Sequence, residues 1–369
     1  MKKIQSLDSI RFFMIMLIVL SHFTLLNQFE ETGWLYNKFL SHGGFAVNYF
    51  FVLSGFGLMY SYVQKNKNLL LNPTSLVDFA VKHIRKLYGL YVVLLFVCIP
   101  YDVISYYDEM GFLGGKFWLN ELLKLILCFP LLQSATGMTQ FSHAFNGVSW
   151  FLSSLFCIYM VCPFLLVNLN KIKRLSSIMS LLVFNIVLLF FVREFFTELE
   201  SRTFFNDLAY GSPYCRVLYV SAGMLVAQMS IYLKSNFIYD KKCGGTIVEF
   251  FAILFMLCSY VMGAFFWPFN GLFTHVVWLL ASCLGIFVFS FENGAISKFL
   301  QMGRVKRLGA LSMYLFLVHY PIKNYMTLVL NKIDMEQFLW AYLIGIFLTL
   351  TLSFLISFAL LKRKEDGLR

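Results

Sequence analysis

Apolar and polar positions alternate along this chain in long blocks. Many apolar runs approach the roughly 20 residues that a helix needs to cross a bilayer, and short polar segments separate them. We expect about ten spanning helices, near residues 8–28, 44–63, 88–107, 148–168, 176–193, 214–233, 247–265, 272–291, 309–330 and 337–361. The pattern predicts an all-α, polytopic integral membrane protein with a single domain over residues 1–369.

The basic residues predict the orientation of these helices. Short loops that carry an excess of Lys and Arg face the cytoplasm in most membrane proteins. This rule places the N-terminus, with Lys2 and Lys3, and the C-terminus in the cytoplasm. The further basic segments assigned to that side are 82–86, 171–174, 234–242, 298–307 and 362–369.

A shorter apolar stretch, 118–133, contains Glu121, Lys124 and Pro130. If it crossed the membrane, every later basic loop would face outward, against the same rule. We therefore expect it to form a re-entrant or interfacial helix on the outer side. It lies within the longest outer segment, 108–147, where a site facing outward could be built.

The composition supports a membrane protein and argues against nucleic-acid binding. Hydrophobic residues make up 59% of the chain and charged residues 13%, compared with about 25% charged in soluble domains. The net charge of +11 comes from basic residues in short loops, a pattern that reports orientation in a lipid bilayer. The eight Cys include no CxxC and are interpreted as buried apolar residues, with no disulfide framework and no metal site.

The first predicted helix carries two ionisable residues, Arg11 and His22. Such residues inside a span are costly and usually functional. Eleven residues at 100° each bring both to one helix face, about 16 Å apart along the axis. Arg11 near the cytoplasmic end could hold a phosphate or carboxylate and could pair with Asp8. His22, further along, could act as a general base or accept an acyl group.

Simpler interpretations of both residues remain open. Arg11 could extend its side chain to the lipid headgroups, and His22 could be a packed, hydrogen-bonded histidine. The other outer histidines, His42, His143 and His275, are interpreted as solvated or capping residues. Adjacent Ser–His pairs such as 142–143 are not read as catalytic, because neighbours on a helix point apart.

Several segments of the chain resemble the acyltransferase-3 family. Residues 7–11 read LDSIR and are followed by His22, similar to the opening of that family. Residues 43–56 read GGFAVNYFFVLSGF, and residues 309–319 read GALSMYLFLVH. Trp150, Leu152, Tyr159 and Pro163 fit a further family helix. These matches occur in family order, although Leu155 stands where many members have a carboxylate.

The resemblance implies roles for particular residues. His22 and Arg11 are expected to be catalytic, with Arg85, Lys86 and Ser54 on the donor-binding side. The basic patch from His83 to Tyr91 has Gly89 where the family commonly has proline, so Arg85 and Lys86 are joint candidates. Trp150, Ser312 and His319 are expected on the acceptor side or in a structural role.

The resemblance also implies an O-acyltransferase of a bacterial inner membrane. The co-substrate would be cytoplasmic acyl-CoA, commonly acetyl-CoA, with no tightly bound cofactor, and the acceptor would be a hydroxyl of a surface glycan. A transporter of a glycan or acyl intermediate, and a scaffold without a site, are the alternatives. A homo-oligomer is compatible with the sequence, which leaves the acceptor and the acyl chain open.

Overall fold

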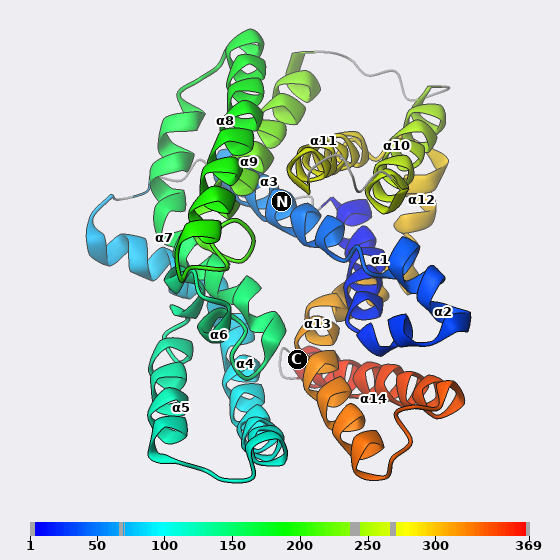
Figure 1. The fold of residues 1–369 in the computed structure, drawn as a ribbon. Coiled ribbons are helices and arrows are strands. Elements are labelled where there is room, and N and C mark those ends of the chain that lie inside the picture. The colour runs from blue at the N-terminus through cyan, green and yellow to red at the C-terminus, as the bar shows by residue number, and fades with distance from the viewer. Residues whose placement is uncertain (1–3, 66–68, 70, 237–243, 266–270, 367–369) are drawn as a thin grey trace.

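The computed structural model describes residues 4–65, 69, 71–236, 244–265 and 271–366, a part of the chain that forms a helical bundle without strands (Figure 1). Lys2, Lys3 and Cys243 lie outside the described residues, as do parts of the segments 234–242 and 362–369. The all-α fold predicted from the sequence is confirmed.

In the described part of the chain, ten long helices lie at the predicted spans. They are α1 (Gln5–Ser21), α3 (Gly44–Lys65), α4 (Pro73–Met110), α7 (Trp150–Asn170), α8 (Leu175–Arg202), α9 (Pro213–Asn236), α10 (Gly245–Phe265), α11 (Gly271–Phe289), α13 (Gly303–Lys332) and α14 (Leu339–Asp366). The shorter pieces are η1 (Thr24–Gln28), α2 (Glu30–Leu35), η2 (Tyr36–Leu40), α5 (Gly115–Cys128), η3 (Gln133–Thr136), α6 (Thr139–Ser142), η4 (Gly147–Ser149) and α12 (Ala295–Leu300).

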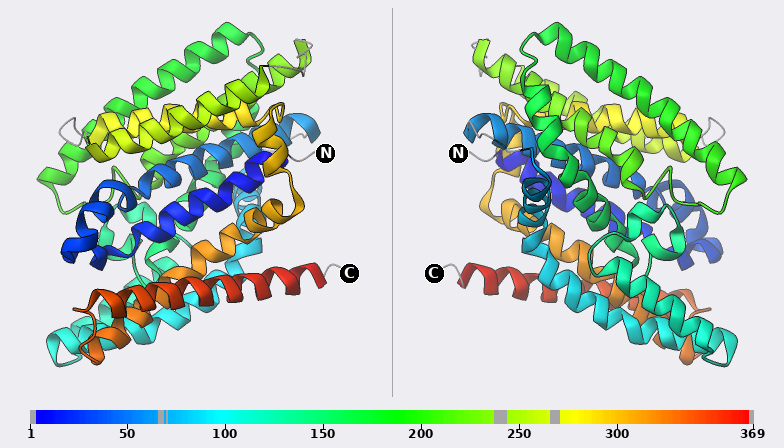
Figure 2. Two further views of the ribbon diagram at one scale, coloured as in Figure 1. Left: turned by 90° about the vertical axis from the view of Figure 1, so that its right-hand side faces the viewer. Right: turned by 90° about the vertical axis from the view of Figure 1, so that its left-hand side faces the viewer.

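Within the described residues, seven helical segments are long and apolar enough to cross a membrane: those containing α3, α4, α7, α8, α9, α10 and α14. Since α1, α11 and α13 are outside this set, the number of about ten spans stays a prediction. The start of α1 and the end of α14 lie at the same end of the bundle (Figure 2), in agreement with the placement of both termini on one side.

Helices α1 and α3 lie in the middle of the bundle, with α8 and α10 on one side and α4 and α14 on the other (Figure 2). In the most apolar window of α8 only 17% of the residues are buried, against 67% in the segment that contains α3. The outer helices therefore present apolar side chains to their surroundings, as expected for contact with lipid.

The contact between α3 and α9 depends on two glycines. A Cβ atom at Gly55 would overlap the carbonyl of Val220, and one at Gly223 would overlap the carbonyl of Val52. Small residues let two helix backbones approach in this way in membrane bundles. The FVLSGF segment thus includes a backbone-to-backbone helix contact, which fixes the height of α3 in the bundle.

Three predicted boundaries differ from the structure. Helix α1 ends at Ser21 and not near residue 28. At this end the Tyr36 hydroxyl donates to the Ser21 carbonyl (2.7 Å), which satisfies one of the last carbonyl groups of the helix. Helix α4 begins at Pro73, much earlier than expected, since the Asn72 side chain caps it by accepting from Ser75 N. The basic patch from His83 to Tyr91 is therefore helical and is not a loop.

The third difference concerns the stretch 118–133. Helix α5 stops at Cys128, two residues before Pro130, as the restriction that proline places on the preceding residue requires. With 14 residues it extends about 21 Å, less than the roughly 30 Å hydrocarbon core of a bilayer. This length agrees with a helix that does not span.

Candidate active site

The break at the end of α1 places His22 among residues from distant parts of the chain. His22 caps α1, and its Nδ1 lies 3.2 Å from Nε2 of His319 on α13. The two rings are 5.2 Å apart, and the ring of Tyr320 stands edge-on to His22 at 5.3 Å. The structure thus brings together two of the predicted site residues, which are nearly 300 positions apart in the sequence.

The hydrogen bonds of this pair fix the positions of its protons. Nδ1 of His319 lies 3.0 Å from the carbonyl oxygen of Leu315, and a carbonyl can only accept, so this nitrogen carries hydrogen. In the neutral ring Nε2 of His319 is then an acceptor, and His22 Nδ1 donates to it. The remaining nitrogen of His22, Nε2, is left with an unprotonated lone pair.

The position of His319 is reinforced from a neighbouring loop. Pro321 has no N–H to donate to the carbonyl of Leu317 four residues before it. The side chain of Asn146, just before α7, donates to that carbonyl instead at 3.0 Å. A Cβ at Gly147 would come within 2.6 Å of the Tyr320 ring. The loop before α7 therefore packs closely against the part of α13 that carries the histidine.

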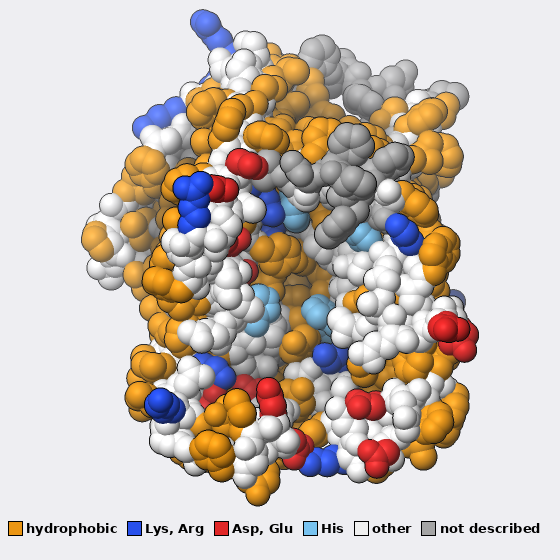
Figure 3. Space-filling model, viewed as in Figure 1, with side chains coloured by type: hydrophobic (Ala, Val, Ile, Leu, Met, Phe, Trp, Pro, Cys, Tyr) orange, Lys and Arg blue, Asp and Glu red, His pale blue; other side chains and the backbone are white. Residues whose placement is uncertain are grey.

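His22 lines a small cavity of about 160 Å³ at this end of the bundle. Ser21, Ser41, Trp150 and Tyr210 contribute to its wall, with the glycines Gly43 and Gly44. Figure 3 shows a hollow near the centre of this face with His side chains around it. A cavity with hydroxyl and imidazole groups in a bundle this apolar is suited to hold a polar group, such as the hydroxyl of a substrate.

The predicted acceptor-side residues divide into two groups. Trp150 and His319 belong to this site, as described above. Ser312 is buried and its hydroxyl donates to the Gly309 carbonyl at 2.8 Å, away from the cavity wall. A Cβ at Gly309 would overlap the backbone of Asp8, so this part of the GALSMYLFLVH segment forms a contact between α13 and α1.

The other end of α1 carries Arg11, which pairs with Asp8 at 3.2 Å as its spacing suggested. Ser54 on α3 donates its hydroxyl proton to the Phe50 carbonyl at 2.8 Å. The ring of His83 on α4 lies 5.5 Å from that of Tyr159. The α4 patch therefore contacts α7 at Tyr159.

Arg85 and Lys86 are exposed on α4 close to His83. These two exposed cations on α4 and the half-exposed Arg11 on α1 are groups that can bind an anion. The two predicted functions thus separate along α1: the basic group at the end where the chain begins, and the histidine pair about 16 Å away along the axis.

Arg216 lies at the cavity that His22 lines and was not singled out from the sequence. Its guanidinium is fully buried between the rings of Phe51, Trp150, Tyr210 and Tyr219, at 4.7–5.5 Å from their centroids. It donates to Asn48 Oδ1 and to the Tyr210 carbonyl, both at 2.6 Å. Cation–π contacts and hydrogen bonds stabilise a buried charge, so Arg216 fixes two rings of the cavity wall.

The signal for Arg216 was its place at the start of an apolar run, where an ionisable residue often has a function. The interpretation of His42 as a solvated residue needs correction, whereas His143 is the C-cap residue of α6 and fits the capping interpretation. His42 is buried, His275 lies 3.4 Å from the Asn48 amide, and His143 lies 3.0 Å from Ser142 Oγ. Ser142 and His143 face each other because α6 ends there and the chain leaves the helical path.

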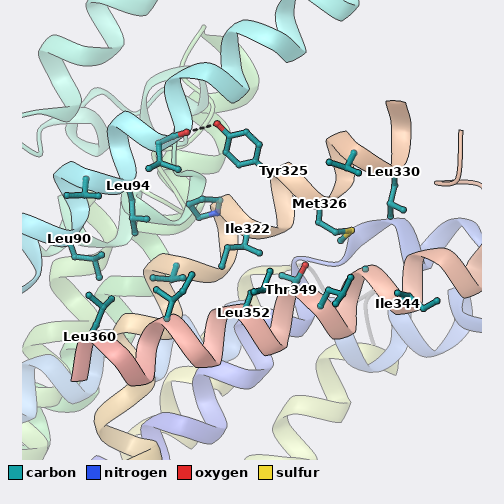
Figure 4. A pocket seen from close by; sticks show the side chains of 18 of the residues that line it. Leu90, Leu94, Ile322, Tyr325, Met326, Leu330, Ile344, Thr349, Leu352 and Leu360 are labelled. Carbon is teal, nitrogen blue, oxygen red and sulfur yellow. Dashed lines mark hydrogen bonds between the residues drawn. The ribbon is translucent and has the colours of Figure 1, made fainter. Parts of the chain in front are cut away.

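A second, larger hollow lies on another side of α13. It is a groove of about 690 Å³ between α4, α13 and α14, lined almost entirely by aliphatic side chains such as Leu94, Ile322 and Leu352 (Figure 4). The hydroxyl of Tyr325 donates to the Val97 carbonyl across it at 2.7 Å. No histidine or charged side chain lines this groove, in contrast to the cavity at His22.

No cluster of three or more His, Cys, Asp or Glu that could hold a metal ion is found in the described part of the chain.

A family model described as an acyltransferase domain, that of the acyltransferase-3 family, matches residues 4–358. The chain therefore belongs to this family and is a membrane acyltransferase. Comparison with curated proteins and with solved structures gives no match.

Proposed function

We propose that this acyltransferase moves an acyl group, acetyl in the simplest case, from cytoplasmic acyl-CoA to a hydroxyl of a cell-envelope polysaccharide or glycolipid in a bacterial inner membrane. The observation that carries the proposal is the direction of the hydrogen bonds from His22 through His319 to Leu315. They leave Nε2 of His22 as a free base beside a polar cavity.

The basic end of α1 supports an anionic donor. The phosphates of CoA would bind near Arg11, Arg85 and Lys86, and the pantetheine arm would extend along α1 toward His22. Because phosphates form strong, directional bonds with guanidinium groups, Arg11 is the residue whose loss should weaken donor binding most.

The chemistry assigned to His22 uses one atom in either of two ways. Nε2 can take the proton of the attacking sugar hydroxyl, or it can attack the thioester and hold the acyl group until the sugar arrives. In both cases His319 keeps Nδ1 of His22 engaged as a donor and thereby directs the lone pair of Nε2 toward the substrate.

The test compares surface glycans of cells that make the intact protein, His22→Ala, Arg11→Ala or no protein, at matched membrane levels. Ester-linked acyl groups should depend on the protein and fall by at least about 100-fold in His22→Ala, the loss typical of a missing general base. His42→Gln, a buried histidine outside the cavity wall, is the matched control and should keep its activity. Normal acylation by stable His22→Ala protein would overturn the proposal.

A further inference from the structure

The loop between α5 and α7 carries a second histidine beside the cavity. His143 lies at the end of the short helix α6, and its ring is 6.1 Å from that of Trp150, a cavity residue. Trp150 lines the cavity together with His22, so both imidazoles lie next to the same side chain of the site. The side chain of His143 is 34% exposed and can therefore meet a substrate that arrives from outside the bundle.

His143 is held by a short chain of hydrogen bonds. The Ser142 hydroxyl donates to Asp207 Oδ2 at 2.5 Å. Since its single hydrogen is used there, Ser142 Oγ accepts at 3.0 Å from Nδ1 of His143. Nδ1 is then protonated, and in the neutral ring Nε2 has a free lone pair. This repeats the arrangement at His22, where a neighbour also fixes Nδ1 as the donor.

Asp207 is itself fixed by its surroundings. It is buried and accepts from the Gly211 N–H at 2.8 Å. Its backbone N–H donates to the Gly137 carbonyl at 3.0 Å, which ties its loop to the loop of His143. Gly137 has φ of +67°, a left-handed conformation that glycine adopts without strain. Two separate loops are thus joined at the Ser142–Asp207 bond.

The electrostatics agree with a histidine that is neutral until it receives a proton. Burial lowers the pKa of His143 below its usual value, and the charge of Asp207 opposes this. Burial raises the pKa of Asp207, against its bonds to Ser142 and the charges of His143 and Arg216. Asp207 from the α8–α9 loop lies 3.8 Å from Nδ1 of His143. His22 lines the same cavity as Trp150, the ring beside His143, and Arg216 acts on Asp207.

We propose that His143 is the acceptor-side base of this acyltransferase: it binds the acceptor hydroxyl and takes its proton. This role rests on the proposed function, in the form where His22 carries the acyl group. When the hydroxyl oxygen bonds to the acyl carbon, its proton passes to His143 Nε2. The bond from the acyl carbon to His22 Nε2 breaks, and that nitrogen regains its electron pair.

Both half-reactions then balance. In the first, His22 Nε2 attacks the thioester, CoA leaves as a thiolate, and the Nδ1 proton of His22 passes to Nε2 of His319. This proton returns to His22 Nδ1 when the bond between the acyl carbon and His22 breaks in the second half-reaction. In the second, the imidazolium of His143 is stabilised through Ser142 by Asp207 and returns its proton to water at the exposed edge of the ring. Ser142 and Asp207 are positioning residues, because they reach the substrate only through His143.

The test uses the purified full-length protein with acetyl-CoA labelled in the acetyl group. The acceptor probe is envelope glycan from which ester groups have been removed by mild base. Release of CoA reports the first half-reaction, and label in the glycan reports the second. His22→Ala should lose both. His143→Gln should still release CoA and keep label on the protein, while transfer to glycan falls at least about 100-fold.

Two further variants separate a positioning role from a structural one. Ser142→Ala keeps the imidazole and the carboxylate but breaks their link, so transfer should fall while CoA release stays normal. Asp207→Asn removes the charge that favours the imidazolium. The pKa of His143 should then fall further, and the acid limb of the transfer profile should move to lower pH. A purely structural Asp207 would lower the amount of folded protein without moving that limb.

The outcomes distinguish failure of the inference from failure of the proposed function. Wild-type transfer by His143→Gln would overturn the role of His143, and so would equal loss of CoA release and transfer in folded protein. If His143→Gln does not fold, Ser142→Ala and the pH profile of Asp207→Asn decide in its place. His42→Gln should keep both half-reactions, and a matching defect there would also overturn the inference. No CoA release by the wild type would instead refute the proposed function.

Discussion

At the scale of single residues, the proposed chemistry depends on which nitrogen of each histidine carries hydrogen. The carbonyl of Leu315 accepts from His319, and this sets the proton on His22 one step further along. A backbone atom of α13 therefore determines the reactive form of a side chain on α1. Neither histidine needs a carboxylate partner for this, in contrast to His143 with Ser142 and Asp207.

We expect His319→Ala to reduce acyl transfer by about 100-fold or more, because His22 would lose the acceptor that holds its tautomer, and a wrong tautomer is costly to a catalytic histidine. His319→Gln should recover part of the activity, since its amide oxygen can accept from His22 Nδ1. The measurement is ester-linked acetyl on surface glycan per amount of membrane protein. Equal activity of the Ala and Gln variants would argue against a positioning role.

At the scale of elements, short departures from regular helix place the site residues. Pro321 leaves the Leu317 carbonyl free within α13, and Asn146 donates to it from the loop before α7. The early end of α1 turns His22 out of the helical path. Both departures bring side chains together that a continuous helix would keep apart.

The Asn146 contact predicts a compensating pair of substitutions. Asn146→Ala would leave a buried carbonyl without a donor, at a cost of about 1–3 kcal/mol in the free energy of unfolding. Pro321→Ala restores an N–H at position 321 that can donate to Leu317 along the helix. The double variant should therefore be more stable than Asn146→Ala alone, as measured by thermal unfolding in detergent. Simply additive losses would show that this bond does not join the two elements.

The contact of α3 with α9 predicts a contrast within one helix. Gly55→Ala would push a Cβ into the Val220 backbone and should cost about 1–3 kcal/mol, as for an overpacked core. Gly57→Ala is the matched control, because nothing lies within 4 Å of a Cβ there. It should be neutral or stabilising by about 0.5–1 kcal/mol, the usual difference between Gly and Ala in a helix. Similar melting temperatures for the two variants would contradict the close contact.

The sequence predicted the positions of the helices well, because an apolar run of spanning length has few alternatives in a membrane. It predicted α5 as a separate short helix from Pro130 and the charge balance of the loops. It also singled out His22, His319 and Trp150, but it could not show that the two histidines share a hydrogen bond. The contacts of Arg216 and the partners of His143 were not predicted, because they come from distant segments of the chain, which no local pattern reveals.

At the scale of the whole molecule, the basic group at Arg11 and the histidine pair occupy opposite ends of α1. This separation matches a donor that arrives from one side of the membrane and an acceptor that arrives from the other. This arrangement of donor and acceptor ends can be tested by measuring on which side of the membrane each loop lies. The basic residues were used above to predict those sides.

In a variant without native cysteines, Lys116→Cys should react with a membrane-impermeant thiol reagent in intact spheroplasts. Lys171→Cys should react only after the membrane is opened, since the positive-inside rule places it in the cytoplasm. Labelling can be read by gel shift. The opposite pattern would invert the orientation and with it the assignment of the donor and acceptor ends.

The contrast between the crowded inner helices and the outer belt has a consequence for sequence divergence. Most side chains of α8, α10 and α14 face outward, where one apolar residue serves nearly as well as another. Amino-acid substitutions should therefore accumulate in these helices. In α1, α3, the start of α7 and the middle of α13, the packing around the proposed site should allow fewer substitutions. Two enzymes of this design could share their reaction and still have low sequence identity over the full chain.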